Sequence, residues 1–218
     1  MQKQNLLELI HPDVQRYAET ISSAEEALLH EIAEYTYAKH ADPQMLSGHL
    51  QGKMLEMFSC MIRPEKILEI GTFTGYSGLC LAKGLTEDGY LHTIDIRDED
   101  VKLARSYFDR SIYSSRIISH TGNALDIIPK LNETWDLVFI DADKPGYIEY
   151  FNLVLPSLRK NGFILADNIF FHGEVLEEPL KGKNAKAIAA FNQLIKDRTD
   201  IEKVALTIRD GLFLIRKL

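Results

Sequence analysis

Oxygen-bearing and amine side chains follow apolar runs at two places in this chain, and a glycine-rich turn follows a third. The three segments are LEIGTFTGYSG (68–78), FIDADK (139–144) and ADN (166–168). The second contains Asp141 and Lys144, and the third ends in Asp167 and Asn168. In an open α/β sheet the carboxyl ends of the parallel strands face one crevice, so these groups are expected to meet there. Three oxygen ligands and an amine would then lie beside a cofactor held by the first segment.

Asp141, Asp167 and Asn168 supply the oxygen donors that a hard divalent cation prefers, Mg²⁺ in the first instance and Ca²⁺ or Mn²⁺ as alternatives. Three protein ligands would leave positions open for substrate and water, which is typical of a catalytic metal. Taken singly, Asp141 could be a helix cap and Asp167–Asn168 a turn, but their joint occurrence favours the metal. Lys144 is a candidate general base, because a nearby metal and a cationic cofactor would lower its pKa.

The glycine loop follows one strand-like run and opens a helix-like segment. Gly71, Gly75 and Gly78 give the spacing G-x-x-x-G-x-x-G, which is neither the dinucleotide fingerprint nor a P-loop. A tight turn without a ligand remains the alternative to cofactor binding. Glu69, two residues before the loop, would repel a pyrophosphate and suits a cofactor with a positive centre or a free amine.

Asp95 ends the next strand-like run, HTIDI. An acidic residue there commonly accepts hydrogen bonds from a ribose diol. The alternative is an N-cap for the helix-like segment that starts near Asp98. The glycine loop upstream favours the ribose.

The composition is typical of a globular protein, with 218 residues, 45% hydrophobic and 26% charged. The net charge of −7 argues against a surface for nucleic-acid phosphate, although a local basic patch remains open. Cys60 and Cys80 lie in apolar helix-like segments, so we expect reduced core residues and a cytoplasmic location. No segment approaches the ~20 apolar residues of a membrane span, and the N-terminus lacks the apolar stretch of a signal peptide.

The pattern predicts helices over residues 1–64, the third from about Ser47 to Met61, and alternation from Lys66 onward. Five strand-like runs cover 66–70, 90–96, 116–121, 135–141 and 162–167, and helix-like segments lie near 75–85, 98–110, 123–131, 145–159 and 183–198. Two last runs, 201–208 and 212–218, flank Arg209-Asp210-Gly211, and Asp-Gly between apolar runs is a hairpin signal. We therefore expect an α/β fold, a Rossmann-like doubly wound seven-stranded sheet of five parallel strands plus a C-terminal antiparallel hairpin. The organisation would be one domain, 1–218, with an N-terminal helical extension and a cofactor-binding core over 65–218.

From about Met45 to the C-terminus the chain resembles the cation-dependent class I O-methyltransferases that use S-adenosylmethionine. It looks closest to the caffeoyl-CoA O-methyltransferase branch and its bacterial relatives, and more distantly similar to catechol O-methyltransferase. The motifs that carry the resemblance are QMLSG (44–48), LEIGTFTGYSG, DADKPGY (141–147) and ADN. The N-terminal ~40 residues match poorly.

This resemblance implies roles for matching positions. The cofactor-binding residues would be Met45, Ser47, Glu69, Gly71, Tyr76, Ser77, Asp95, Ala124, Asp141 and Asp143. The metal ligands would be Asp141, Asp167 and Asn168, and the catalytic residues Lys144 and Asp141. The implied reaction is methylation of a vicinal aromatic diol, of catechol or caffeoyl type, by a homodimer. Three alternatives stay open: a tRNA hydroxyuridine methyltransferase of the same family, an NAD-dependent oxidoreductase and a non-catalytic binding module.

Overall fold

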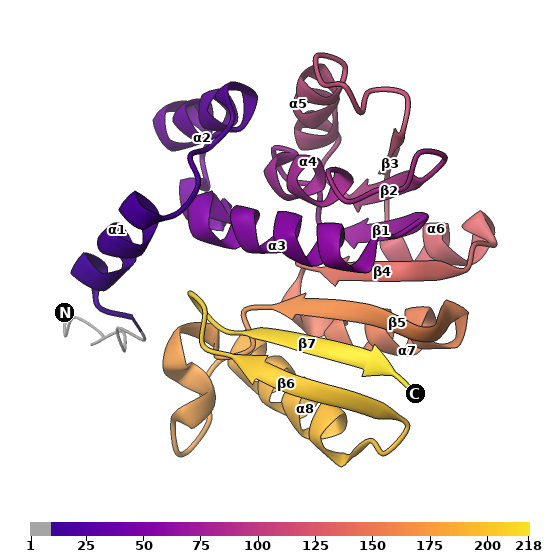
Figure 1. Cartoon of the computed structure of the whole chain (residues 1–218). Coiled ribbons are helices and arrows are strands. Elements are labelled where there is room, and N and C mark those ends of the chain that lie inside the picture. The colour runs from indigo at the N-terminus through magenta and orange to yellow at the C-terminus, as the bar shows by residue number, and fades with distance from the viewer. Residues whose placement is uncertain (1–9) are drawn as a thin grey trace.

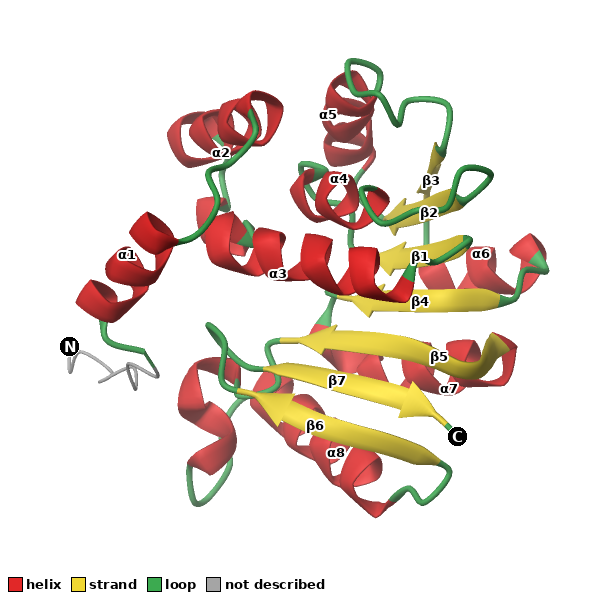
Figure 2. Ribbon diagram, viewed as in Figure 1, coloured by secondary structure: helices red, strands yellow, loops and turns green. Residues whose placement is uncertain are grey.

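Seven strands form one sheet with helices on both faces in the computed structural model, which describes residues 10–218 (Figures 1 and 2). The strand order is β3-β2-β1-β4-β5-β7-β6; β1 to β5 are parallel, and β7 is antiparallel to both β5 and β6. The strands are β1 Lys66–Ile70, β2 Tyr90–Asp95, β3 Ile117–Thr121, β4 Trp135–Ile140, β5 Leu158–Asp167, β6 Ile201–Leu206 and β7 Leu212–Lys217. The predicted fold class is confirmed.

Three helices and a short 3-10 turn precede the sheet: α1 Pro12–Ile21, α2 Ala27–Lys39, η1 Pro43–Met45 and α3 Gly48–Ile62. The others are α4 Tyr76–Ala82, α5 Asp98–Phe108, α6 Ala124–Leu131, η2 Lys144–Gly146, α7 Tyr147–Ser157, η3 Phe171–Leu176 and α8 Lys183–Asp197. Residues 1–9 of the predicted helical extension lie outside the described residues. The predicted third helix is confirmed, and it ends where Arg63 takes a left-handed φ of 51° directly before Pro64.

The largest difference from the predicted boundaries lies at the start of β5. The helix predicted to run to about 159 ends at Ser157, and β5 begins at Leu158 instead of 162. Leu158 pairs with Trp135 of β4, and a register shift separates this pair from the regular ladder that starts at Leu137 and Phe163. Tertiary pairing with β4 therefore overrides the local sequence signal at this strand end.

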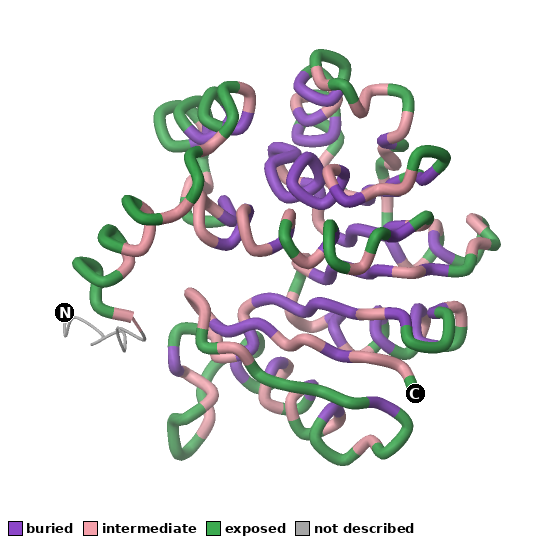
Figure 3. The backbone as a smooth tube through the Cα atoms, viewed as in Figure 1, coloured by how far each residue is buried: buried purple, intermediate pink, exposed green. Residues whose placement is uncertain are grey.

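Two apolar layers hold the helices to the sheet, because successive strand residues point to opposite faces. Val138 and Ile140 belong to the layer formed with α6, α7 and α8, whereas Leu137 and Phe139 belong to the layer formed with α2 to α5. Figure 3 shows the buried backbone concentrated in the central strands and in α4. Full burial of each such aliphatic or aromatic side chain stabilises the fold by roughly 1.5–3 kcal/mol. The layers leave the carboxyl ends of β1, β2, β4 and β5 as one edge, where the candidate site lies.

The two cysteines are both free, and only one of them is a core residue. Cys80 is buried in α4, as predicted, but Cys60 is exposed on α3. The prediction for Cys60 is wrong because α3 buries Leu55 and Ser59 instead, and the next residue along the helix is rotated by about 100° from that face.

Among residues 10–218, no helix is both long enough and apolar enough to cross a membrane. The cytoplasmic location stays a prediction of the sequence.

Candidate active site

The carboxyl ends of β1 and β4 come into contact at Gly71. Its N–H donates to the carbonyl of Ile94 at 2.9 Å, and the N–H of Asp141 donates to the carbonyl of Ile70 at 2.8 Å. Gly71 has a φ of 109°, and a Cβ there would lie 1.9 Å from the backbone oxygen of Asp141. Only glycine meets both demands. Gly75, with a φ of 86°, then turns the chain into α4. The loop therefore brings the cofactor segment directly against Asp141.

Glu69 lies fully buried behind this loop. Its two carboxyl oxygens accept hydrogen bonds from Ser77 Oγ and Thr93 Oγ1, each at 2.6 Å. Burial raises the pKa of Glu69 to about 8; the two hydroxyl donors oppose the shift, and the negative charges of Asp141 and Asp95 add to it. A positively charged ligand group beside Glu69 would stabilise its ionised form and offset the cost of its burial.

Asp95 organises the glycine loop itself. Its Oδ2 accepts from the N–H of Phe73 at 2.9 Å, and its Oδ1 accepts from the N–H of Arg97 at 3.0 Å. The first bond holds Phe73 at a left-handed φ of 47°. The N-cap residue of α5 is Arg97, with no side-chain cap bond, so Asp95 is not the helix cap that the sequence allowed as an alternative. The ribose role stays a prediction.

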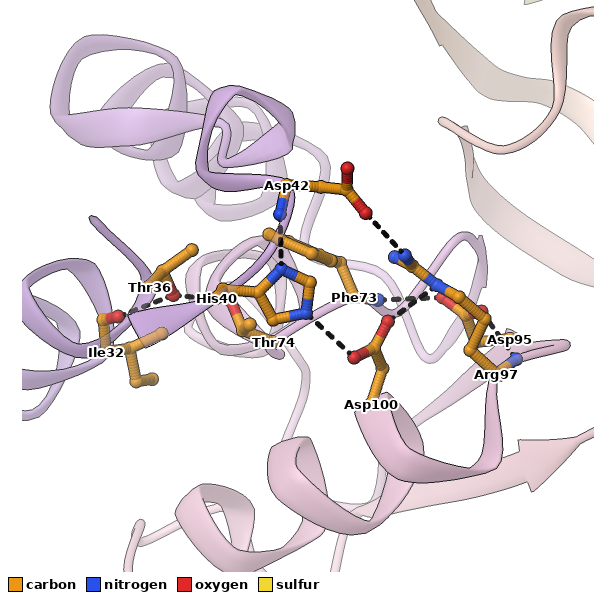
Figure 4. Close-up of polar contacts among 9 residues, drawn as sticks. All are labelled: Ile32, Thr36, His40, Asp42, Phe73, Thr74, Asp95, Arg97 and Asp100. Atoms are coloured by element: carbon orange, nitrogen blue, oxygen red, sulfur yellow. Dashed lines mark hydrogen bonds and ion pairs between the residues drawn. The ribbon is translucent and has the colours of Figure 1, made fainter. Parts of the chain in front are cut away.

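A polar cluster ties the chain before η1 to the β2–α5 loop (Figure 4). Nδ1 of His40 accepts from the N–H of Asp42 at 3.0 Å, and Nε2 lies 3.0 Å from Asp100 Oδ1. Arg97 pairs with Asp100 at 2.6 Å and with Asp42 at 3.2 Å, and its guanidinium lies over the ring of Phe73. The cluster thus holds the segment that leads into η1 close to the chain that directly follows Asp95.

Met45 and Ser47 follow that cluster. Met45 ends η1 with 43% of its surface exposed, and Ser47 is buried just before α3. The carbonyl of Ser47 accepts a hydrogen bond from Arg209 of the β6–β7 turn. The structure therefore places Ser47 against the carboxyl edge of the sheet through a residue 162 positions away.

The hydroxyl of Tyr76 donates to Glu25, and its ring packs against Gly52 of α3. This contact joins α4 to the N-terminal helices. The hydroxyl of Tyr76 therefore already has a protein partner. The cofactor contact that the resemblance implies for Tyr76 stays a prediction.

Ala124 and Asp143 follow β3 and β4 along the chain, Ala124 as the first residue of α6 and Asp143 directly before η2. Ala124 is buried as the first residue of α6, and the preceding Gly122 donates to the carbonyl of Asp95 at 2.9 Å. Asp143 accepts a hydrogen bond from the hydroxyl of Tyr150. Both positions are thereby fixed near the carboxyl edge of the sheet, and their cofactor contacts stay predictions.

Lys144 and Asp141, the two predicted catalytic residues, lie in contact at this edge. Nζ of Lys144 lies 3.0 Å from Asp141 Oδ1 and donates to the hydroxyl of Tyr147 at 2.8 Å. The Tyr147 hydroxyl in turn lies 3.1 Å from the carbonyl of Asp167. Burial by itself would lower the pKa of Lys144, but Tyr147, Asp141 and Asp167 outweigh it and raise the pKa. The sequence-based expectation of a lowered pKa assumed two bound cations, and the protein groups alone act in the opposite direction.

Asp167 is 3% exposed and lies within the field of Asp141. Burial raises the pKa of Asp167 to about 6, and Asp141 adds to the shift, whereas Lys144, Gln51 and Arg209 oppose it. Its two oxygens accept one hydrogen bond each, from Gln51 and from the N–H of Asn168. A carboxylate offers about four lone-pair positions, so acceptor capacity remains for a cation.

Asn168 is the third of the predicted metal ligands. It has a left-handed φ of 56°, and its Nδ2 donates to Asp210 Oδ2 at 3.2 Å, which leaves the amide oxygen as the free donor atom. Within residues 10–218, no group of three His, Cys, Asp or Glu side chains is arranged to hold a metal. The candidate site therefore depends on two carboxylates and one amide oxygen, a donor set that suits a hard cation and not zinc.

Residues with no chemical role in the sequence prediction also belong to the site. The resemblance motif DADKPGY contains Tyr147, which follows Lys144 by three positions, so a helical start there would have brought the two side chains together. Gln51 had no local signal, because it meets Asp167 across 116 positions.

The sheet, the glycine loop and the acidic edge define a Rossmann-like α/β protein whose candidate site lies at the carboxyl ends of its parallel strands. Residues 19–218 match the family model described as O-methyltransferase, and the chain belongs to that family. It is thus an O-methyltransferase by fold and by family.

Several relatives are similar over most of the chain. Catechol O-methyltransferase of Niastella koreensis is 34% identical over 173 residues, which cover 75% of this chain and 78% of that protein. Caffeoyl-CoA O-methyltransferase 5 of Nicotiana tabacum is 28% identical, covering 86% and 83%. The O-methyltransferase from Bacillus cereus in complex with SAH superposes with a TM-score of 0.87 at 28% identity, covering 94% of this chain and 97% of that one.

Proposed function

We propose that this protein is an S-adenosylmethionine-dependent, divalent-metal-dependent O-methyltransferase that acts on a vicinal aromatic diol. The observation that carries the proposal is the meeting of Glu69, Asp141, Lys144 and Asp167 at one sheet edge, where the glycine loop adjoins a lysine and two carboxylates. The relatives that are named catechol and caffeoyl-CoA O-methyltransferases support this acceptor class. The relatives solved with SAH or SAM support the cofactor.

In this proposal the glycine loop receives the methionine end of the cofactor. The ammonium and sulfonium groups of the cofactor would stabilise the ionised form of Glu69, and Asp95 would accept from the ribose hydroxyls. Ser47, Ala124 and Asp143, together with Met45, would line the remaining contacts. Tyr76 and Ser77, the first two residues of α4, would also contact the methionine end of the cofactor.

Asp141, Asp167 and Asn168 would hold the divalent cation, since they offer three oxygen donors at the same edge. When bound, the cation would supply positive charge that lowers the pKa of the acceptor hydroxyl and of the Lys144 ammonium. Lys144 Nζ then accepts the hydroxyl proton. Asp141 and Tyr147 fix the position of this amine through the bonds at 3.0 and 2.8 Å. The acceptor oxygen forms a bond to the methyl carbon as the carbon–sulfur bond breaks, and S-adenosylhomocysteine leaves.

A direct test incubates the protein with labelled S-adenosylmethionine, Mg²⁺ and a panel of acceptors. We expect label transfer to catechol and to caffeoyl-type esters, and little transfer to the corresponding mono-phenols. The panel includes tRNA as the second acceptor class, which the net charge of −7 disfavours. Transfer to tRNA alone would replace the diol proposal, and binding of NAD in place of adenosylmethionine would overturn the methyltransferase proposal.

Asp95→Ala is expected to weaken S-adenosylhomocysteine binding by about 1–3 kcal/mol, the scale of a buried hydrogen bond to a charged group. The loss has two sources, the ribose and the N–H of Phe73 that Asp95 holds. Isothermal titration calorimetry measures the change. Asp98→Ala, three residues on at the start of α5, is the matched control and should bind normally; unchanged affinity in Asp95→Ala would exclude the ribose role.

A homodimer stays part of the proposal. Helix α1 buries none of its residues, and Val14, Tyr17 and Ile21 on it are 59%, 65% and 68% exposed. An apolar helix surface of this kind suits an interface between copies. Sedimentation equilibrium at micromolar concentration is expected to give twice the mass of one chain, and Tyr17→Glu with Ile21→Glu is expected to reduce it. A single-chain mass for the unmodified protein would contradict the dimer.

A further inference from the structure

The turn between β6 and β7 lies against the candidate metal centre. In the sequence, Arg209-Asp210-Gly211 reads only as a hairpin signal. In the structure the side chains of Arg209 and Asp210 each hold a side-chain amide that belongs to the site, one on Gln51 and one on Asn168. The backbone of the turn also pairs with the segment after β5, since Ile169 and Phe170 donate to the carbonyls of Gly211 and Asp210.

Asp210 decides which end of the Asn168 amide is free. An ionised carboxylate only accepts hydrogen bonds, so the bond at 3.2 Å to Asp210 requires the NH₂ group of Asn168 on that side. The amide is planar, and its oxygen must then point away from Asp210. No hydrogen bond among residues 10–218 uses that oxygen. Asp210 is itself fixed, because its other oxygen accepts the N–H of His172 at 2.6 Å.

Arg209 fixes the side-chain amide of Gln51 in the opposite sense, with the amide oxygen facing its partner. A guanidinium only donates, so its contact at 2.9 Å requires the Gln51 oxygen on that side. The NH₂ group of Gln51 then faces Asp167 and donates to its Oδ2 at 2.8 Å. Gln51 is fully buried, which leaves it little freedom to reorient. The same guanidinium also donates to the carbonyl of Ser47.

We propose that this turn positions the metal ligands: Asp210 aims the amide oxygen of Asn168 at the cation, and Arg209 acts through Gln51 to orient the carboxylate of Asp167. Both are positioning residues, since neither contacts the reacting atoms. The inference rests on the proposed function in one respect, that Asp167 and Asn168 hold a divalent cation. The orientation of each amide is specific. The Asp210 carboxylate can pair only with the NH₂ group of Asn168, and the Arg209 guanidinium can pair only with the oxygen of Gln51.

Asp210→Asn is the decisive variant, because it changes polarity while keeping size. The new side-chain oxygen can still accept the N–H of His172, and the new NH₂ group then faces Asn168. Asn168 has to invert its amide to pair with it, which turns an NH₂ group toward the cation. Mn²⁺ binding, measured as loss of the free-ion signal in electron paramagnetic resonance, is expected to weaken about 10–100-fold, the usual effect of removing a partner that orients a metal ligand. The melting temperature in EDTA is expected to stay close to that of the unmodified protein.

Asp136→Asn is the matched control. Asp136 is 15% exposed against 13% for Asp210 and likewise accepts backbone N–H groups, from Glu65 and Lys66, but it lies at the start of β4, the opposite end of the sheet. It should bind Mn²⁺ normally. A second pair of variants tests the role of Arg209. Arg209→Met removes the donor to Gln51 and should weaken Mn²⁺ binding. Arg209→Lys keeps a group that only donates hydrogen bonds, so most of the Mn²⁺ binding should be retained.

Four outcomes decide the matter. Weak Mn²⁺ binding by Asp210→Asn and Arg209→Met, with unchanged melting in EDTA and rescue by lysine, supports the proposal. Normal Mn²⁺ binding by Asp210→Asn overturns it and leaves the proposed function intact. A fall in metal-free melting temperature that matches the loss of binding also overturns it, because the turn would then be only structural. If the unmodified protein does not bind Mn²⁺, the proposed metal dependence fails and this inference fails with it.

Discussion

Replacement of Lys144 by alanine is expected to lower kcat by roughly 10²–10⁴-fold, the usual contribution of a general base. The Nζ of Lys144 lies between Asp141 and Tyr147, which hold it in place. Alanine removes the proton acceptor and leaves the glycine loop, Glu69 and Asp95 untouched. Binding of S-adenosylhomocysteine should therefore remain close to normal, so that the loss is confined to the chemical step.

Lys144→Arg separates a base from a positive charge. Arginine keeps the charge and can keep the ion pair with Asp141, but it does not deprotonate in proteins. If Lys144 accepts the proton, the arginine variant should be as slow as the alanine variant in steady-state assays with a catechol. An arginine variant with normal kcat would assign to Lys144 an electrostatic role only. Lys102→Ala is the control, since Lys102 is 75% exposed on α5 and pairs with Asp98, which is 56% exposed.

Removal of divalent cations is expected to abolish methyl transfer, and Mg²⁺, Mn²⁺ or Ca²⁺ should restore it to differing extents. The physical reason is the electrostatics of the sheet edge. Burial raises the pKa of Asp167 to about 6, and the negative charge of Asp141 adds to the shift. A divalent cation between oxygen donors would relieve both the burial and the repulsion.

Removal of the cation should also be measurable without an activity assay, as a change in the melting temperature. A cation that binds only the folded protein stabilises it by about 2.7 kcal/mol at a concentration of 100 Kd. For a chain of this size that corresponds to a rise in Tm of roughly 5–10 °C. The double variant Asp141→Asn with Asp167→Asn should show no such rise. Undiminished turnover of a catechol in excess EDTA, after dialysis against it, would rule out the metal dependence.

Much of the architecture followed from local pattern. Near-continuous apolar runs alternating with helical segments predicted five parallel strands, and the Asp-Gly turn predicted the final antiparallel pair, as the structure has them. The glycine loop could be located as well, because Gly71 and Gly75 occupy positions of positive φ that other residues take at a cost. The same kind of reasoning gave the wrong burial for Cys60, because an apolar helix segment does not reveal which of its residues face the core.

Residue types and spacing also predicted which groups meet at this edge, because Asp141, Lys144, Asp167 and Asn168 follow strand ends and parallel strands bring their carboxyl ends together. Only the tertiary structure decided how these groups are held. Gln51 on α3 and the turn at Arg209–Asp210 reach Asp167 and Asn168 across 116 and 42 positions of sequence. Such contacts carry no local signal, because a side-chain amide in a helix or a charged pair in a hairpin looks the same whether it faces solvent or a catalytic edge. Folding alone brings them into contact, and burial then removes the water that would otherwise compete for their hydrogen bonds.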